Sequence, residues 1–303
     1  ADNIGKAYRS GDSKDKYKSL LKTVFLDEAK PLEGLKIVID ASNGAAYKIG
    51  PQLLLELGAE VIPIACSPNG YNINKNCGST NPETIKNTVS ATNSDIGIAL
   101  DGDADRILII DETGKIVNGD EILYILARAN IDNPKFNSKV VGTILSNIGL
   151  ESSLNEINVE LHRSDVGDKN VFKMMKSIGS NLGGETSGHI IHDDYSPTGD
   201  GLLVALLIIR ESIKSKQSIS NLLKDCKLVS QTNINLEIGD IDIQNDFLNS
   251  IASRANEKLG DGRTIIRKSG TEPLIRILIE SENKETSKDV IEFIKEEISK
   301  GSK

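Results

Sequence analysis

The 303-residue sequence contains no tryptophan, and only 4% of its residues are aromatic. This scarcity argues against a protein that binds single-stranded nucleic acid by stacking bases on aromatic side chains. The formal net charge of −8 disfavours polyanions, so we expect neither nucleic acid nor an anionic membrane surface as a partner. Any anionic ligand would have to be held by a local cluster of positive groups.

Cysteines and long apolar runs are also scarce. The three cysteines, Cys66, Cys77 and Cys226, form no CxxC pair, which favours unreactive thiols in a reducing compartment over a disulfide framework. The longest apolar run, residues 202–209, is too short to cross a bilayer, and no signal peptide opens the sequence. We therefore expect a cytoplasmic location.

The patterns that are present predict an α/β fold. Hydrophobic residues make up 38% and charged residues 26% of the chain, as in a typical globular protein. Short β-branched runs alternate with helical segments, which is typical of consecutive βαβ units. We predict three mixed α/β units over residues 1–115, 116–228 and 229–303, the last a smaller α+β unit. Residues 1–30 would form a leading helix or linker.

The most distinctive segment is an acidic hexapeptide that contains Asp101, Asp103 and Asp105 and ends at Arg106. Carboxylates this close repel one another unless a positive charge lies among them, and oxygen ligands suit Mg²⁺ or Ca²⁺. A solvated acidic turn is the alternative, but the apolar flanks and the small residues between the aspartates favour a tight metal-binding loop. A calcium helix-loop-helix loop is excluded, because it needs glycine where Arg106 stands and helices on both sides.

A glycine-rich loop at residues 183–189 carries Glu185, Ser187 and His189. If the loop is extended, alternation places these three side chains on one side. A carboxylate with a hydroxyl suits a polyhydroxyl ligand, although a hairpin with incidental polar residues explains the pattern as simply. His189 could carry a proton, but a lone histidine is more often structural.

A third loop, at residues 267–273, places two cations and two hydroxyls around Gly270, and Arg276 follows it. Cations and backbone N–H groups in a turn can bind a phosphate, whereas an ordinary polar β-turn is the alternative. A metal loop, a polyol-binding loop and a phosphate-binding loop together predict sugar-phosphate chemistry. In such chemistry, positioning and charge neutralisation carry much of the catalysis.

These three loops occur in the order seen in the α-D-phosphohexomutases, and the sequence resembles that family over nearly its whole length. Residues 72–83 and 189–191 look most like the bacterial phosphoglucosamine mutase branch. The resemblance implies mixed α/β domains two, three and four of that family. It also implies a cytoplasmic isomerase, monomeric or homodimeric, that acts on a hexosamine phosphate through a bisphosphate intermediate and supplies peptidoglycan precursors.

The resemblance further implies roles for individual residues. Mg²⁺ would be held by Asp101, Asp103 and Asp105, and Arg106 would contact phosphate, with His189 beside the sugar as a second catalytic residue. The substrate would be bound by Asp168, Glu185, Ser187, Arg267, Ser269, Gly270 and Thr271.

The sequence departs from the family pattern at two of these loops. Lys268 stands where a proline is usual, which adds charge and loosens the phosphate-binding loop, so affinity could change in either direction. Thr186 stands where glutamine is commoner, at a position that we do not expect to be critical.

The family's phosphorylated serine lies in its first domain, in a Ser-His-Asn-Pro type loop that these residues lack. The similar stretch at 79–82 matches the domain-two segment instead. We therefore expect the C-terminal three quarters of an enzyme, inactive alone, whose parent interconverts glucosamine 6-phosphate and glucosamine 1-phosphate. The alternatives are a phosphomannomutase or phosphoglucomutase on the same scaffold, or a catalytically inactive sugar-phosphate binding fragment.

Overall fold

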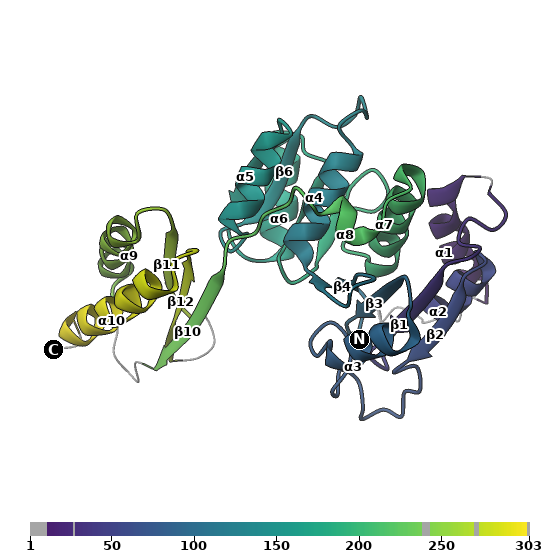
Figure 1. Ribbon diagram of the computed structural model, residues 1–303, viewed down its shortest axis with the longest axis horizontal. Coiled ribbons are helices and arrows are strands. Elements are labelled where there is room, and N and C mark those ends of the chain that lie inside the picture. The colour runs from purple at the N-terminus through teal and green to yellow at the C-terminus, as the bar shows by residue number, and fades with distance from the viewer. Residues whose placement is uncertain (1–10, 27, 238–242, 270–272, 302–303) are drawn as a thin grey trace, which may run out of the picture.

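The computed structural model describes residues 11–26, 28–237, 243–269 and 273–301 (Figure 1). Within this range the chain forms sheets of five, four and three strands, each accompanied by helices. The predicted leading helix is present as α1 (Ser13–Lys22), followed by a short 3-10 turn, whereas residues 1–10 lie outside the described range. No helix in the described ranges is both long and apolar enough to cross a membrane.

The first sheet has the strand order β2-β1-β3-β4-β5. Strands β1, β2 and β3 are parallel, and β4 and β5 continue the sheet in antiparallel pairing. Every residue of β3 is buried, as expected for a central strand covered on both faces. The elements are β1 (Lys36–Asp40), α2 (Ile49–Glu56), β2 (Glu60–Ile64), α3 (Glu83–Thr92), β3 (Ile96–Leu100), β4 (Ile107–Ile110) and β5 (Ile116–Val117).

The second sheet repeats this topology in the order β7-β6-β8-β9, with three parallel strands and an antiparallel fourth. The glycine-rich loop joins its third and fourth strands, which is the position that the acidic hexapeptide holds in the first sheet. Both loops therefore leave the carboxyl end of a central parallel strand, where α/β sheets commonly bind ligands. The elements are β6 (Lys139–Thr143), α5 (Ile148–Glu156), β7 (Glu160–Ser164), α6 (Asp168–Ile178), β8 (Leu182–Gly184) and β9 (Ile190–His192).

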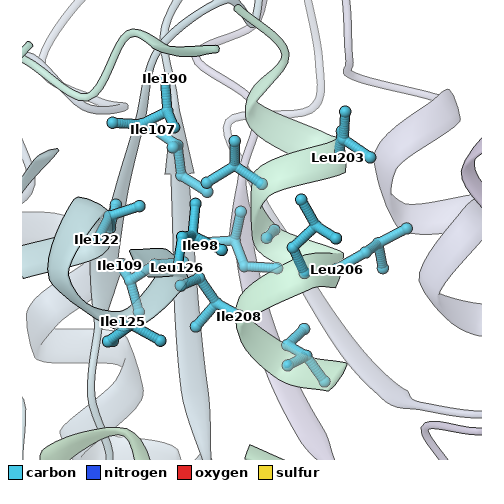
Figure 2. Close-up of a cluster of buried hydrophobic side chains, with 14 of the residues drawn as sticks. Ile98, Ile107, Ile109, Ile122, Ile125, Leu126, Ile190, Leu203, Leu206 and Ile208 are labelled. Carbon is cyan, nitrogen blue, oxygen red and sulfur yellow. The ribbon is translucent and has the colours of Figure 1, made fainter. Parts of the chain in front are cut away.

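Two helices cross between these sheets. Helix α4 (Gly119–Ala129) follows the first sheet but packs on β6 and β8 of the second, whereas α7 (Gly201–Ser215) follows the second sheet and packs on β3 and β4 of the first. Figure 2 shows side chains from β3, β4, β9, α4 and α7 meeting in one cluster. The first two units therefore share a single hydrophobic core, which fixes the two loops relative to each other.

The third unit has its own core. Its antiparallel sheet has the order β10-β12-β11, and helices α9 and α10 cover one face of it around residues such as Ile251, Ile277 and Ile294. In Figure 1 it lies at one end of the molecule, adjoining the second unit. The remaining elements are α8 (Ile219–Leu222), β10 (Gln231–Glu237), α9 (Asn245–Leu259), β11 (Arg263–Lys268), β12 (Leu274–Glu280) and α10 (Lys284–Gly301).

A buried histidine in the second unit makes stability depend on pH. The His192 side chain is 2% exposed, and its Nε2 lies 3.2 Å from the Asn130 side-chain nitrogen, from which it can accept a hydrogen bond. Burial lowers the pKa of His192 below its usual value, and nearby Asp194 offsets this only in part. Since an unfolded histidine titrates near about 6.5, the unfolded chain binds a proton below that pH that the folded chain does not. Stability is therefore lost as the pH falls from about 6.5 toward the folded pKa.

We predict that the free energy of unfolding of the wild type falls more steeply between about pH 7 and pH 5 than that of His192→Gln. The difference in slope is expected to reach up to about 1.4 kcal/mol per pH unit, the value for one proton. Glutamine retains an oxygen that can accept from Asn130 but does not titrate. Urea denaturation at several pH values measures both slopes, and parallel slopes would contradict the prediction.

Candidate functional site

The metal loop, residues 101–106, brings its three aspartates together. Carboxylate oxygens of Asp101, Asp103 and Asp105 lie within 4.8 Å of one another, so one cation could contact all three. Asp101 is 1% exposed, Asp103 is exposed, and Asp105 keeps a buried Oδ1 that has no hydrogen-bond partner within the described part of the chain. Within the described residues this oxygen forms an ion pair only with Arg106 Nε at 3.6 Å, which is too far for a hydrogen bond. Three convergent carboxylates, one with an oxygen that accepts no hydrogen bond there, fit a hard divalent cation such as Mg²⁺.

Neighbouring backbone holds the metal loop in shape. The Gly102 carbonyl accepts a hydrogen bond from the Ala45 N–H at 2.8 Å, and the Ala104 carbonyl accepts one from the Gly201 N–H, at the start of α7, at 2.9 Å. Ala104 itself has a φ of +65°, the left-handed region that non-glycine residues rarely adopt. A Cβ on Gly44 would lie 2.1 Å from the Gly102 oxygen, so this close approach requires glycine.

Arg106 neutralises part of the charge of the metal loop. Its Nε lies 2.8 Å from Asp101 Oδ2, and its backbone N–H donates to Asp101 Oδ1 at 3.1 Å. Burial raises the pKa of Asp101, as do the carboxylates of Asp105 and Asp103, whereas Arg106 lowers it. A bound cation would favour the charged form of this buried carboxyl.

The second loop forms a turn rather than an extended strand. The Gly188 N–H donates to the Glu185 carbonyl at 2.9 Å, and Gly188 has a φ of +92°. The loop is therefore not extended, so the alternation that would align the three polar side chains does not apply. Glu185 Oε1 accepts a hydrogen bond from the Gly167 N–H at 2.9 Å, Ser187 is exposed and His189 is buried. We call residues 185–189 the sugar turn.

The metal loop and the sugar turn contact each other directly. His189 Nδ1 lies 3.1 Å from Asp105 Oδ2, and the Ile107 N–H donates to the Gly188 carbonyl at 3.1 Å. Arg106 and His189 also form an isolated antiparallel bridge. Two loops that lie far apart in sequence thus contact each other, and they bring carboxylates, a guanidinium and an imidazole together.

The predicted substrate-binding residue Asp168 is the first residue of α6 and is exposed. It follows Gly167, whose N–H holds the Glu185 carboxylate. Asp168 therefore lies one residue from a direct contact with the sugar turn.

The third loop lies apart from the other two, on β11 and β12 at the far end of the molecule (Figure 1). Arg267 pairs in register with Arg276, and both line a cavity of about 370 Å³ between the third sheet and Leu145. Burial and the neighbouring Arg276 both lower the pKa of Arg267, so an anion would relieve a concentration of positive charge. The Ser269 N–H donates to the Leu274 carbonyl at 2.9 Å. The predicted residues Gly270 and Thr271 lie outside the described residues.

Buried residues that support the metal loop escaped the sequence analysis. Asp40, at the end of β1, is fully buried and accepts hydrogen bonds from the Ser42 N–H at 2.9 Å and the Gly78 N–H at 2.8 Å. The Ser42 hydroxyl in turn donates to the Leu100 carbonyl at 2.6 Å, next to Asp101. An aspartate that ends an apolar strand and precedes small residues is the sequence signal that could have revealed it.

Comparison with known proteins places this arrangement in a family. Models of the phosphoglucomutase/phosphomannomutase family match residues 15–114 as α/β/α domain II, residues 118–228 as α/β/α domain III and residues 238–297 as the C-terminal domain. The chain belongs to the phosphohexomutase family. The predicted fold class, consecutive mixed α/β domains two, three and four of a phosphohexomutase, is confirmed.

Curated phosphohexomutase relatives share much of the sequence. A phosphoglucosamine mutase from Ruegeria sp. (strain TM1040) is 45% identical over 93% of this chain and 64% of the relative. One from Aeromonas salmonicida is 40% identical over 98% of this chain and 67% of the relative. The chain thus spans about two thirds of the length of the curated relatives it matches.

Solved phosphohexomutase structures share the fold. A phosphoglucomutase/phosphomannomutase family protein from Burkholderia thailandensis superposes with a TM-score of 0.80 at 22% identity, covering 97% of this chain and 66% of that one. An Aspergillus fumigatus N-acetylphosphoglucosamine mutase, in complex with GlcNAc-6P and magnesium, gives a TM-score of 0.75 at 16% identity. That alignment covers 99% of this chain and 68% of the fungal one.

Proposed function

We propose that the protein is a phosphoglucosamine mutase, which interconverts glucosamine 6-phosphate and glucosamine 1-phosphate. The observation that carries this proposal is the direct contact between a three-carboxylate loop and the sugar turn, through His189 and Asp105. The phosphoglucosamine mutases at 40–45% identity support the choice of sugar. We further propose a cytoplasmic enzyme, monomeric or homodimeric, that supplies an amino-sugar phosphate for peptidoglycan precursors.

In this proposal Asp101, Asp103 and Asp105 would hold Mg²⁺, which as a Lewis acid would neutralise charge on the transferring phosphoryl group. Arg106 would contact the same phosphate, and its ion pair with Asp101 keeps the guanidinium beside the carboxylates of the metal loop. His189, held 3.1 Å from Asp105, would exchange a proton with a sugar hydroxyl.

The substrate would lie between the remaining residues. Glu185 would accept hydrogen bonds from the sugar hydroxyls, and Ser187 would exchange hydrogen bonds with them. Asp168 would lie beside these two residues. At the other end the phosphate that does not react is bound by Arg267, Ser269, Gly270 and Thr271. These contacts convert binding energy into orientation, which is the main contribution that a protein makes to phosphoryl transfer.

The proposed reaction passes through a phosphoserine carried by a part of the enzyme other than these 303 residues. The C1 hydroxyl oxygen of glucosamine 6-phosphate attacks the serine phosphate, the phosphorus–oxygen bond to serine breaks, and the serine oxygen gains a proton. The bound glucosamine 1,6-bisphosphate then turns round, and the serine oxygen gives up its proton and attacks the C6 phosphate. The bond from phosphorus to the C6 oxygen breaks, and that oxygen takes up a proton. Two in-line transfers thus replace one difficult intramolecular step.

The proposal is tested by comparing kcat/KM of the full-length protein for glucosamine 6-phosphate, glucose 6-phosphate and mannose 6-phosphate, with a hexose 1,6-bisphosphate as activator. We expect the largest value for the amino sugar. A larger value for glucose or mannose phosphate would favour a phosphoglucomutase or phosphomannomutase. Binding of the sugar phosphates without turnover would identify an inactive binding protein.

A further inference from the structure

A buried carboxylate outside the three loops joins two segments of the second unit. Asp120, in the first turn of α4, is fully buried. Its Oδ2 accepts a hydrogen bond from the Asn147 N–H at 2.9 Å and another from the Thr186 hydroxyl at 3.0 Å. Its Oδ1 has no hydrogen-bond partner within the described ranges. Burying a carboxylate with one oxygen that accepts no hydrogen bond lowers the stability of the fold. We therefore ask what its two hydrogen bonds position.

The contact of Asp120 with Thr186 anchors the sugar turn. The Thr186 carbonyl accepts a hydrogen bond from the Gly119 N–H at 3.1 Å, so both the backbone and the side chain of Thr186 are held by α4. A Cβ on Gly119 would lie 1.9 Å from the Glu185 carbonyl oxygen, which shows how closely the helix and the turn approach. The position of Glu185 therefore depends on α4.

The contact of Asp120 with Asn147 anchors the segment to which the third unit is attached. The Asn147 side chain exchanges two hydrogen bonds of 2.9 Å with the backbone of Val229, in the connection that leads to β10. The neighbouring Ser146 carbonyl accepts a hydrogen bond from Arg263 of β11 at 2.7 Å. Asp120 therefore holds the backbone of residues 146–147, and this segment contacts the third unit, which carries the phosphate-binding loop.

We propose that Asp120 is a positioning residue that fixes the sugar turn, through Thr186, relative to the segment that carries the third unit. This inference rests on the proposed function, in which the sugar turn and the phosphate-binding loop hold opposite ends of one substrate. Two binding groups on separate units act together only if their spacing is fixed, and a misplacement of about 1 Å can cost about 100-fold. Thr186 is the residue through which Asp120 acts on the sugar turn.

The test is a mutant cycle on the full chain, with the dissociation constant for glucosamine 6-phosphate measured by calorimetry. Asp120→Asn keeps the shape of the side chain but loses the charge, and Thr186→Val loses the donating hydroxyl. We expect each single variant to weaken sugar-phosphate binding by about 10-fold. The double variant should bind about as tightly as either single variant, because the two residues act as one unit. Thr186→Ser keeps the hydroxyl and should retain the wild-type affinity.

Mg²⁺ affinity and the free energy of unfolding are measured on the same variants. A positioning role predicts unchanged Mg²⁺ affinity, because none of the metal-loop carboxylates is altered. Additive losses in the double variant, or equal loss in Thr186→Ser and Thr186→Val, would overturn the inference. If Asp120→Asn does not fold, the comparison of the two Thr186 variants still decides.

The outcome separates this inference from the proposed function. A wild-type chain that binds none of the hexose 6-phosphates contradicts the proposed function, and the inference falls with it. A wild-type chain that binds them, with variants that bind equally well, leaves the function standing and removes the role of Asp120.

Discussion

Replacing Asp103 by asparagine in the full-length protein is expected to lower mutase turnover by about 100-fold or more, because one of three convergent carboxylates loses its charge. Asp103 is exposed, so its replacement should leave folding intact. The same substitution should weaken Mg²⁺ binding, measured by calorimetry. Steady-state kinetics at saturating Mg²⁺ and at limiting Mg²⁺ will show whether excess metal restores part of the rate.

Asp289→Asn is the matched control for this prediction. Asp289 lies on α10 and is exposed, so the substitution removes the same charge far from the metal loop. It should leave both turnover and Mg²⁺ affinity unchanged. If Asp103→Asn and Asp289→Asn have the same turnover and the same Mg²⁺ affinity, the assignment of Asp103 as a metal ligand is contradicted.

Replacing Gly188 by alanine is expected to destabilise the shared core of the first two units by about 3 kcal/mol or more. The φ of +92° strains any L side chain, and the new Cβ would lie 1.9 Å from the Ile107 carbonyl oxygen, a backbone atom that cannot yield alone. Since Gly188 lies in the sugar turn and contacts β4, we expect this substitution also to separate the two loops. The midpoint of urea denaturation, followed by far-UV circular dichroism, measures the loss.

Gly34→Ala distinguishes steric clash from backbone strain. Gly34 has a nearly equal φ of +88°, but a Cβ there would meet no atom within 4 Å. It should cost only about 1–2 kcal/mol, the usual penalty for an L side chain in the left-handed region. If the two variants lose the same stability, the contact between Gly188 and Ile107 does not hold the units together.

The acidic hexapeptide could be predicted from sequence because its information is local. Three aspartates at alternate positions between two β-branched runs are enough to define a strand, a loop and a strand, and β3 and β4 have those bounds. The arginines of the third loop were similarly visible as local charge in an acidic chain. Spacing along the sequence, however, does not state which loops meet.

Two features of the fold were not predicted from the sequence. Helix α5 (Ile148–Glu156) escaped the sequence analysis, because Gly149 and two serines weaken its pattern and its buried apolar face is short. The exchange of α4 and α7 was equally hidden, since an all-apolar stretch such as 202–209 shows that a helix is buried but not against which sheet.

The candidate site shows the same division. The sequence left open whether the second loop is extended, and the structure shows a turn that Gly188 closes with a positive φ. Residues that position others, such as Asp40 and Asp120, carry no motif of their own, because their effect arises from backbone groups far away in sequence. Chemistry that depends on residue type was predictable, and chemistry that depends on burial was not.

The most direct test of the account is the position of a metal in crystals of the chain grown with Mn²⁺, which suits the same oxygen ligands as Mg²⁺ and scatters anomalously. The account predicts an anomalous peak enclosed by the carboxylates of Asp101, Asp103 and Asp105, beside His189. A peak elsewhere, or a metal loop that remains metal-free at saturating Mn²⁺, would contradict it.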